Sequence, residues 1–166
     1  MKEKKVTFAY REYNTSSELT IQERKLLAEA RKSSVNAYSP YSDFSVGSVV
    51  LLANGKIVSG NNQENIAFPS GLCAERVAVF AAGAQFPGVP FKAVAITARS
   101  DNFSVKQPVT PCGACRQVLM EYENRYKTPI RIILQGEKGK IWIFESCGNL
   151  LPMAYVSEEL KRQSER

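Results

Sequence analysis

The chain has 166 residues, a length typical of one domain with its own hydrophobic core, and it contains no histidine. Catalytic arrangements of the Ser-His-Asp and Cys-His types are therefore excluded, and any zinc site must be built from thiolates and carboxylates. The net charge of +6 at pH 7 comes from scattered lysines and arginines, without the basic patch and interleaved aromatics of a nucleic-acid-binding protein.

The first residues contain no sign of a targeting segment. Residues 1–5 are mostly charged, and no apolar run follows that could serve as a signal peptide. No window approaches the roughly 20 apolar residues needed to cross a bilayer. We therefore expect a cytoplasmic protein without a membrane partner, whose four cysteines are reduced or metal-bound rather than disulfide-paired.

The chain divides into an N-terminal arm, residues 1–19, and one domain, residues 20–166. In the arm, Val6, Phe8 and Tyr10 occupy alternate positions, a pattern that favours a short edge strand. No internal repeat, low-complexity tract or linker interrupts the rest of the sequence, so we expect a single catalytic domain.

The domain begins with a helix and a hairpin. Thr20 starts a capping box, and the apolar stripe that follows predicts a helix over residues 21–36. Strands are predicted over residues 46–53 and 56–60, on either side of Asn54-Gly55. Asn-Gly is typical of a type I′ turn, so this segment is predicted to be a β-hairpin.

Helices and strands alternate in the remainder. One helix is predicted from Cys73 to Gly83, and a second begins at Thr110-Pro111, with Thr as N-cap and Pro as first helical residue, and runs to Asn124. Apolar runs predict strands over residues 93–98, 130–134 and 141–144, and a charged run predicts a last helix near 157–165. This alternation indicates an α/β fold with a sheet covered by helices on both faces.

Three of the cysteines stand at two predicted helix starts. Cys112 and Cys115 are three residues apart, so they share one face of a helix, and Cys73 begins the other helix. Helix N-termini stabilise thiolates through unpaired N–H groups and the positive end of the dipole. Three thiolates would hold a catalytic zinc ion and leave its fourth position for water.

Two charged residues follow Cys73. Glu75 is the candidate proton carrier, because without histidine this role falls to a carboxylate, lysine, tyrosine or cysteine. Its spacing from Cys73 does not put both on one helical face, so it could equally be an acidic residue that complements the helix dipole. Arg76 could withdraw charge from a ligand sulfur by a hydrogen bond, or be an ordinary surface arginine.

The cysteines allow two other interpretations. Residues 111–115, Pro-Cys-Gly-Ala-Cys, resemble a dithiol redox motif, but that interpretation leaves Cys73 and Glu75 without a role. A closed structural zinc site would use Cys147 as fourth ligand, although Cys147 has no close partner cysteine. A small buried thiol is the simpler interpretation of Cys147.

Five segments, in order, resemble the small zinc-dependent cytidine deaminases that act on free nucleosides. They are residues 37–44 (Ala-Tyr-Ser-Pro-Tyr-Ser-Asp-Phe), 62–65 (Asn-Gln-Glu-Asn), 73–76 (Cys-Ala-Glu-Arg), 111–117 (Pro-Cys-Gly-Ala-Cys-Arg-Gln) and 150–152 (Leu-Leu-Pro). A lone Cys-x-x-Cys is weak evidence, whereas five segments in order are specific. The resemblance implies a three-layer α/β/α fold with a mixed central sheet of about five strands, one zinc ion per subunit and a homotetramer.

The resemblance also implies the reaction. In this family, zinc-bound water deaminates cytidine and 2′-deoxycytidine to uridine and 2′-deoxyuridine, a step of pyrimidine salvage, with a conserved glutamate as proton shuttle. Carried over, the zinc ligands are Cys73, Cys112 and Cys115, the proton shuttle is Glu75, and Arg76 tunes the zinc. The substrate contacts are Phe44 against the pyrimidine, Asn62 and Glu64 on the ribose 3′-hydroxyl, and Ala74 and Tyr155. From the residues alone, the loop around Asn62 could equally be turn-rich with Asx caps.

Three positions depart from the family pattern: Ile66 replaces a small residue, Phe68 a tyrosine, and Tyr155 a phenylalanine. The preference among cytidine, deoxycytidine and related nucleosides therefore stays open. A deaminase of another cytosine compound, such as blasticidin S, is the alternative within enzymes, and a zinc-stabilised binding module is the alternative outside them. A polynucleotide-editing deaminase usually has histidine where Cys73 stands, and would need a nucleic-acid groove.

Overall fold

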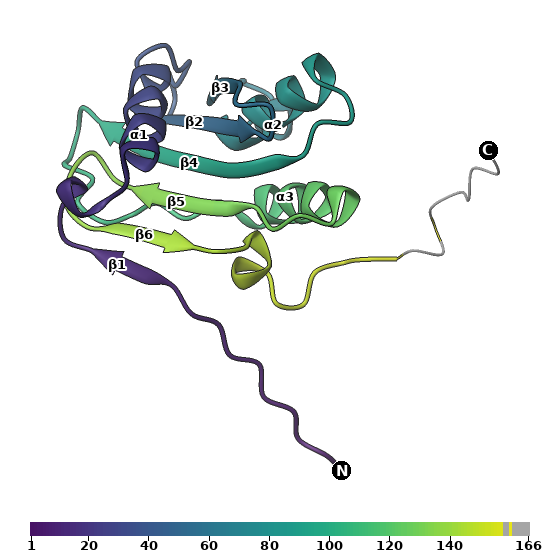
Figure 1. Cartoon of the computed structure of the whole chain (residues 1–166). Helices are drawn as coiled ribbons and strands as arrows, with labels where there is room; N and C mark the ends of the chain where they lie inside the picture. Colours follow the sequence, from purple (N-terminus) through teal and green to yellow (C-terminus); the bar gives the residue numbers. More distant parts are fainter. Residues whose placement is uncertain (158–159, 161–166) are drawn as a thin grey trace.

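Figure 1 shows the computed structural model of the chain, which describes residues 1–157 and 160. Over these residues a six-stranded sheet has the order β1-β6-β5-β4-β2-β3, with β4 and β5 parallel and all other neighbours antiparallel. In chain order the strands and α-helices are β1 (Arg11–Tyr13), α1 (Ile21–Ser34), β2 (Phe44–Leu52), β3 (Ile57–Asn61), α2 (Ala74–Gln85), β4 (Phe91–Ser100), α3 (Gly113–Tyr126), β5 (Arg131–Gln135) and β6 (Ile141–Phe144).

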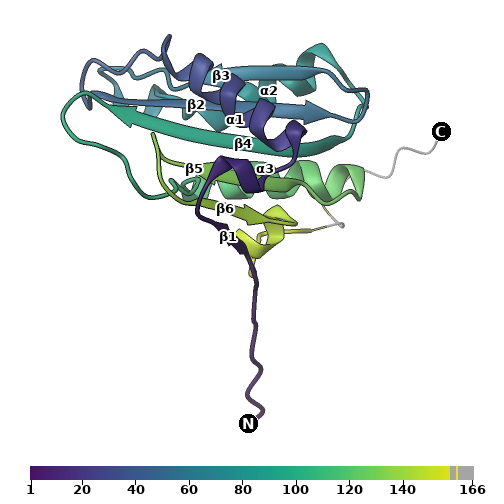
Figure 2. The same cartoon turned by 60° about the vertical axis from the view of Figure 1, so that its left-hand side comes forward.

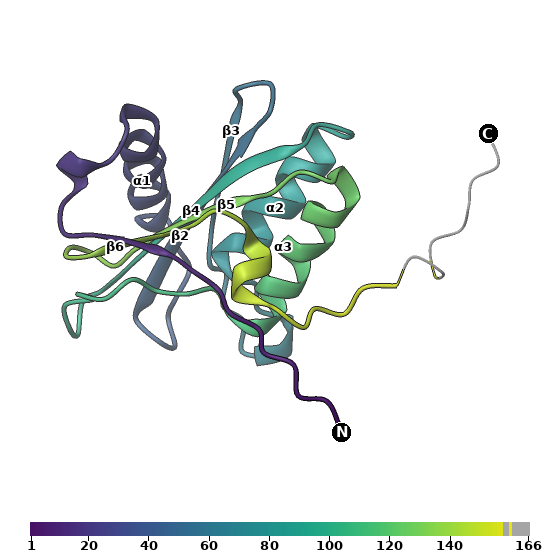
Figure 3. The ribbon, with the colours of Figure 1, turned by 60° about the horizontal axis from the view of Figure 1, so that its bottom comes forward.

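Helices cover both faces of the sheet, α1 on one side and α2 with α3 on the other (Figure 3). Successive side chains of the internal strand β4 point to opposite faces of the sheet. Because helices cover both faces, the side chains on both sides of β4 are buried. Val94 and Ile96 join the core beneath α2 and α3, while Ala93 and Ala95 join the core beneath α1. The predicted α/β class and the three-layer arrangement are therefore confirmed.

A glycine sets the distance between α2 and the sheet. A Cβ atom at Gly60 of β3 would lie 2.4 Å from the backbone nitrogen of Ala78 in α2, closer than two such atoms can approach. The absence of a side chain at this position lets α2 lie directly against β3. This contact fixes the start of α2, where Cys73 and Glu75 are found.

The sixth strand comes from the N-terminal arm. The alternating Val6, Phe8 and Tyr10 predict an edge strand over these residues, but the observed strand β1 begins only after them, at Arg11, and pairs with β6. Val6 and Phe8 are exposed. The Tyr10 ring stacks with Phe144 and contacts the Trp142 ring at a tilt, and both partners belong to β6, which fixes where the pairing begins. Figure 2 shows β1 at the edge of the sheet, with the preceding residues extending away from the domain.

The β2–β3 hairpin forms as predicted, but its turn is of another type. A type I′ turn needs positive φ at both central residues, and among the described non-glycine residues φ is positive only at Asp43 and Lys127. Asn54 therefore keeps negative φ, and Gly55 alone is left-handed at 82°. The Gly55 N–H donates to the Leu52 carbonyl, and the Leu52 N–H donates to the Lys56 carbonyl, so the turn consists of the three residues 53–55 instead of the predicted two.

Several element boundaries differ from the prediction. Thr20 caps α1 with the predicted capping box, and α1 ends at Ser34 rather than residue 36. The N-cap of α3 is Cys112 instead of Thr110, because the Cys112 carbonyl accepts the first helical hydrogen bond, from the Arg116 N–H. β4 is longer than the predicted strand at both ends. The helix predicted near 157–165 lies mostly outside the described residues. No helix among the described residues is long and apolar enough to cross a membrane.

Candidate metal centre and active site

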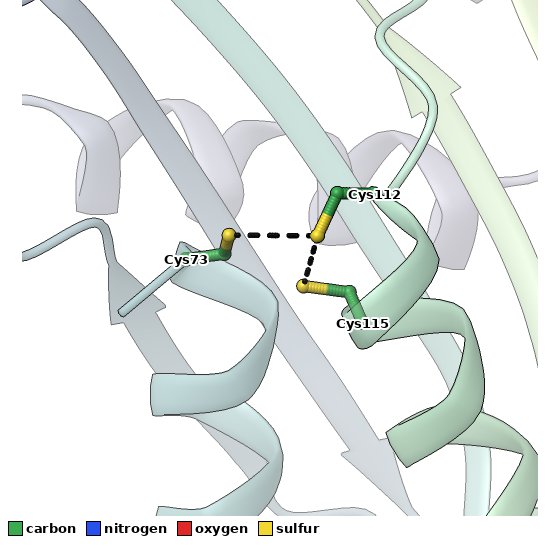
Figure 4. A group of neighbouring side chains, drawn as sticks. All are labelled: Cys73, Cys112 and Cys115. Carbon is green, nitrogen blue, oxygen red and sulfur yellow. Dashed lines mark hydrogen bonds between the residues drawn. The ribbon is translucent and has the colours of Figure 1, made fainter. Parts of the chain in front are cut away.

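Three sulfur atoms meet where α2 and α3 begin (Figure 4). The Sγ atom of Cys112 lies 3.8 Å from that of Cys73 and 3.5 Å from that of Cys115, and all three lie within 4.8 Å of one another. Ligands at about 2.3 Å around a tetrahedral zinc ion have sulfurs roughly 3.8 Å apart. The donor set therefore fits zinc in both chemistry and spacing. Among the described residues Cys147 does not join this cluster, and its buried sulfur contacts Met120.

The helix starts explain why these sulfurs are free to bind a metal. Cys73 and Cys112 are the N-cap residues of α2 and α3, and neither side chain makes a capping hydrogen bond to the described part of its helix. Cys115 is the third residue of α3 and is fully buried. Both helices thus direct unpaired N–H groups and a positive dipole end toward the cluster, which favours thiolates.

The Cys73 and Cys115 thiols differ in acidity. A hydrogen bond from the Cys115 thiol lowers the pKa of Cys73 to about 5, against the opposing effect of burial, and the Arg76 guanidinium adds to the lowering. Arg76 NH2 lies 4.0 Å from the Cys73 sulfur and 3.5 Å from the Gly71 carbonyl oxygen. The same hydrogen bond to Cys73, together with burial, raises the pKa of Cys115. The Arg76 guanidinium thus lies close to the Cys73 sulfur.

Glu75 is buried beside the sulfurs, with 5% of its surface exposed. Burial raises the pKa of its carboxyl group, and the nearby Cys73 acts in the same direction. Helical spacing alone does not bring Glu75 next to Cys73, but Cys73 has an extended backbone (φ −68°, ψ 151°), so helical spacing does not apply between them. This geometry resolves the spacing problem that the sequence posed.

A cavity of about 820 Å³ opens above the cluster. Cys73, Cys112 and Glu75 are among the residues that line it, and so are the predicted substrate residues Phe44, Asn62, Glu64 and Ala74. Further lining residues that the sequence did not single out include Tyr41, Leu72, Val109 and Thr110. This volume lies in the range of small-molecule sites, and a few polar groups converge within a mostly apolar wall.

Asn62 and Glu64 are engaged with the segment that leads into β2. The Asn62 Oδ1 accepts from the Val46 N–H at 2.7 Å, and its Nδ2 donates to the Phe44 carbonyl at 2.9 Å. The Glu64 carboxylate accepts from the Tyr41 N–H at 2.9 Å and from both the N–H and the hydroxyl of Ser42. Although burial opposes it, these hydrogen bonds lower the pKa of Glu64. Both side chains therefore hold the segment that carries Phe44.

Tyr155 lies apart from the cavity of its own chain. Its backbone makes two hydrogen bonds with the Gln117 side chain, at 2.8 and 3.1 Å. The side chain is largely exposed, and Tyr155 is not among the described residues that line the cavity. Phe68 lines the cavity and contacts the Tyr41 ring edge-on, while Ile66 is exposed nearby in the chain.

Arg116 is a site residue to which the sequence assigned no role, although it stands within the Pro-Cys-Gly-Ala-Cys-Arg-Gln segment. Its guanidinium donates to the carbonyls of Pro111 at 2.8 Å and Leu150 at 2.9 Å, and to the Thr110 hydroxyl at 3.3 Å. It therefore fixes the residues directly before Cys112 against the C-terminal part of the domain.

Comparisons with known proteins agree with this geometry. The chain is 41% identical over 143 residues to a cytidine deaminase of Sporosarcina psychrophila, which covers 86% of this chain and 97% of that protein. It is 37% identical over 135 residues to a cytidine deaminase of Halalkalibacterium halodurans, covering 81% and 95%. The crystal structure of cytidine deaminase from Burkholderia pseudomallei superposes with a TM-score of 0.70 and 34% identity, covering 82% of this chain and all of that one.

The fold and the cysteine cluster define a zinc-binding deaminase class, and a family model confirms it. The model described as "Cytidine and deoxycytidylate deaminase zinc-binding region" matches residues 20–128. The chain therefore belongs to the cytidine and deoxycytidylate deaminase family, and it is a deaminase enzyme. The predicted family is confirmed, and zinc as cofactor is supported by both the family and the sulfur cluster.

Proposed function

We propose that this enzyme hydrolytically deaminates cytidine and 2′-deoxycytidine to uridine and 2′-deoxyuridine, as a step of pyrimidine salvage in the cytoplasm. The observation that carries the proposal is the cluster of three sulfurs beside a buried carboxylate, at a cavity whose volume lies in the range of small-molecule sites. The relatives named as cytidine deaminases, which match most of the chain, support cytosine nucleosides as substrates.

One zinc ion per subunit would be held by Cys73, Cys112 and Cys115. A zinc ion with three protein ligands supplies a Lewis acid that makes water more acidic. Arg76 near the Cys73 sulfur, and the two helix N-termini, offset the negative charge of three thiolates. The charge balance therefore favours retention of a metal by sulfur ligands alone.

Glu75 would move the protons of the reaction. Water adds its oxygen to C4 of the cytosine, and the bond from C4 to the amino nitrogen breaks, so cytidine and water give uridine and ammonia. Glu75 accepts one proton from the attacking water and delivers it to N3. It then accepts the second proton of that water, from the hydroxyl now on C4, and delivers it to the amino group, which leaves as ammonia as the C4 carbonyl forms. Its burial beside the sulfurs supports this role, because a positioned carboxylate shielded from solvent serves well as both base and acid.

Phe44, Ala74, Asn62 and Glu64 would bind the nucleoside. Phe44 packs against the pyrimidine, and the two polar residues accept the ribose 3′-hydroxyl. Each keeps hydrogen-bonding capacity after its contacts to the backbone: a carboxylate has about four acceptor positions, and an amide oxygen has two. Both residues line the cavity, which supports their contact with the sugar.

We also propose a homotetramer in which Tyr155 contacts the substrate of a neighbouring subunit. Tyr155 is exposed and is not among the described residues that line its own cavity, which fits a role in another subunit's site. Exposed apolar side chains beside the cavity, those of Tyr41, Phe68 and Leu72, support a protein interface there.

The proposal is tested by an ultraviolet assay of the purified enzyme with cytidine and 2′-deoxycytidine, with zinc measured on the same sample. Conversion of both nucleosides by a preparation holding one zinc per chain is the expected result. A fully zinc-loaded enzyme that converts neither nucleoside would rule out the proposed substrates. Light scattering of the same preparation checks the tetramer.

A further inference from the structure

The loop between β4 and α3, residues 101–112, contacts the residues that carry Phe44. The rings of Phe44 and Phe103 are stacked, with centroids 6.2 Å apart and planes 19° from parallel. The neighbouring residues are joined as well, because the Asn102 Nδ2 donates to the Asp43 Oδ2 at 3.2 Å. Asn102 and Phe103 of the loop therefore contact Asp43 and Phe44. Asp43 directly precedes β2, and Phe44 is its first residue.

The loop has anchors of its own. Val105 is buried, and its carbonyl accepts from the Glu137 N–H at 2.8 Å. The Ser104 hydroxyl donates to the Glu137 carboxylate at 3.3 Å. Ser104 and Val105, which follow Phe103, are thus bound to the turn between β5 and β6. Asn102, which precedes Phe103, is bound to Asp43. These contacts hold the Phe103 ring in a defined place, although the residue is 58% exposed.

The backbone at Phe44 is also held in place. Asp43 has a left-handed backbone with φ of 50°, the Phe44 N–H donates to the Ser42 hydroxyl at 3.1 Å, and its carbonyl accepts from Asn62. The remaining freedom is the rotation of the Phe44 side chain. Phe44 lines the cavity, and the partner that its ring stacks with is Phe103, so Phe103 restricts this rotation.

We propose that Phe103 is a positioning residue for nucleoside binding, which holds the Phe44 ring in the orientation that receives the pyrimidine. This inference rests on the proposed function. A preorganised aromatic ring strengthens binding. Phe103 itself takes no part in proton transfer, because Cys73 and Glu75 stand at the start of α2, and Cys112 and Cys115 at the start of α3. The role therefore predicts an effect on KM and little effect on kcat.

The test compares Phe103→Ala with Phe8→Ala, a control at an equally exposed position of the arm, at 59%. A stacked aromatic pair corresponds to roughly two- to tenfold in an equilibrium constant. We expect Phe103→Ala to raise the KM for cytidine by about that factor, with kcat within about twofold of wild type. Phe103→Tyr should restore the KM because it keeps the ring, and Phe8→Ala should leave both constants unchanged.

A double-mutant cycle with Phe44→Leu separates positioning from a general effect of the loop. In the Phe44→Leu background, Phe103→Ala should change the KM and the dissociation constant of uridine by less than about twofold. An unchanged KM in Phe103→Ala, or an equal increase in both backgrounds, would overturn the positioning role while cytidine turnover by wild type still supports the proposed function. Failure of wild-type enzyme to bind uridine or convert cytidine would overturn both.

Discussion

The cysteine cluster and the pair Asn62 and Glu64, which we propose to bind the ribose, differ in how their polar groups are already used. We call them the sulfur end and the sugar end of the site. At the sulfur end, Cys73, Cys112 and Cys115 meet one another, and neither N-cap sulfur makes a capping bond to the described part of its helix. At the sugar end, Asn62 and Glu64 already hold the segment that leads into β2. The sulfurs are thus left available for a ligand, whereas Asn62 and Glu64, if they bind the ribose as we propose, serve structure and binding together.

This difference predicts that changes at the sulfur end remove function and spare the fold. Cys115→Ala should reduce the zinc content to a small fraction of one per chain and abolish deamination, because two sulfurs cannot form the three-ligand site. Atomic absorption on the purified variant measures the metal. Cys147→Ser is the matched control, since Cys147 is buried away from the cluster, and it should keep its zinc. Loss of zinc in the control alone would contradict the assignment of the ligands.

Glu75→Gln should separate metal binding from proton transfer. The amide keeps the size of the carboxylate but cannot accept the proton of water, so kcat should fall by about 10²- to 10⁴-fold. Zinc content and thermal stability should match wild type, because Glu75 is not counted among the ligands. The assay is the conversion of cytidine under saturating conditions, and undiminished turnover would exclude Glu75 as proton carrier.

Asn62→Ala should show the double use of the sugar end. It leaves the Val46 N–H and the Phe44 carbonyl without their partner, and we expect the free energy of unfolding to fall by about 1–3 kcal/mol. The KM for cytidine should rise as well. Urea denaturation measures the first effect, and Asn54→Ala, which removes an exposed turn contact to the Lys56 N–H, is the control. Weaker binding at undiminished stability would mean that the two uses are separate.

The smallest expected effect concerns the arm, far from both ends of the site. Hydrogen bonds from Lys140 and Trp142 lower the pKa of Glu12 below its usual value. A lowered carboxyl pKa stabilises the folded state above the unfolded-state pKa, and this contribution is lost as the pH falls through the folded-state pKa. Glu12→Gln should therefore lose less stability than wild type between about pH 5 and about pH 3 in urea titrations. If both proteins lose the same free energy of unfolding over this pH range, the Glu12 carboxylate contributes no pH-dependent stability.

Features of the protein that depend on local patterns could be predicted from the sequence. The capping box of Thr20, the apolar run of β4 and the cysteine positions at two helix starts are local patterns, and each specified its element or site. The class of fold followed from them. The exact start of α3, with Cys112 as N-cap, could not be predicted from local patterns. Thr110 and Pro111 fit a helix start equally well until the contacts of Arg116 are known.

The remaining features depend on contacts between distant parts of the chain. The start of β1 is set by the Tyr10 ring on Trp142 and Phe144, which no local pattern in the arm reveals. Likewise, the sequence of the loop after β4 contains no motif that relates Phe103 to Phe44. The sequence therefore did not predict residues whose roles arise from tertiary packing, such as Tyr10 and Phe103. It did predict the cysteines, because few residue types can bind a metal.

We propose that three cysteine sulfurs hold one zinc ion and that no protein atom fills its fourth position, which is left for water beside Glu75. Zinc K-edge X-ray absorption of the active, zinc-loaded enzyme tests it most directly. We predict three sulfur ligands at about 2.3 Å and one oxygen or nitrogen ligand at about 2.0 Å. Four sulfur ligands, or a zinc ion without sulfur ligands, would contradict the account.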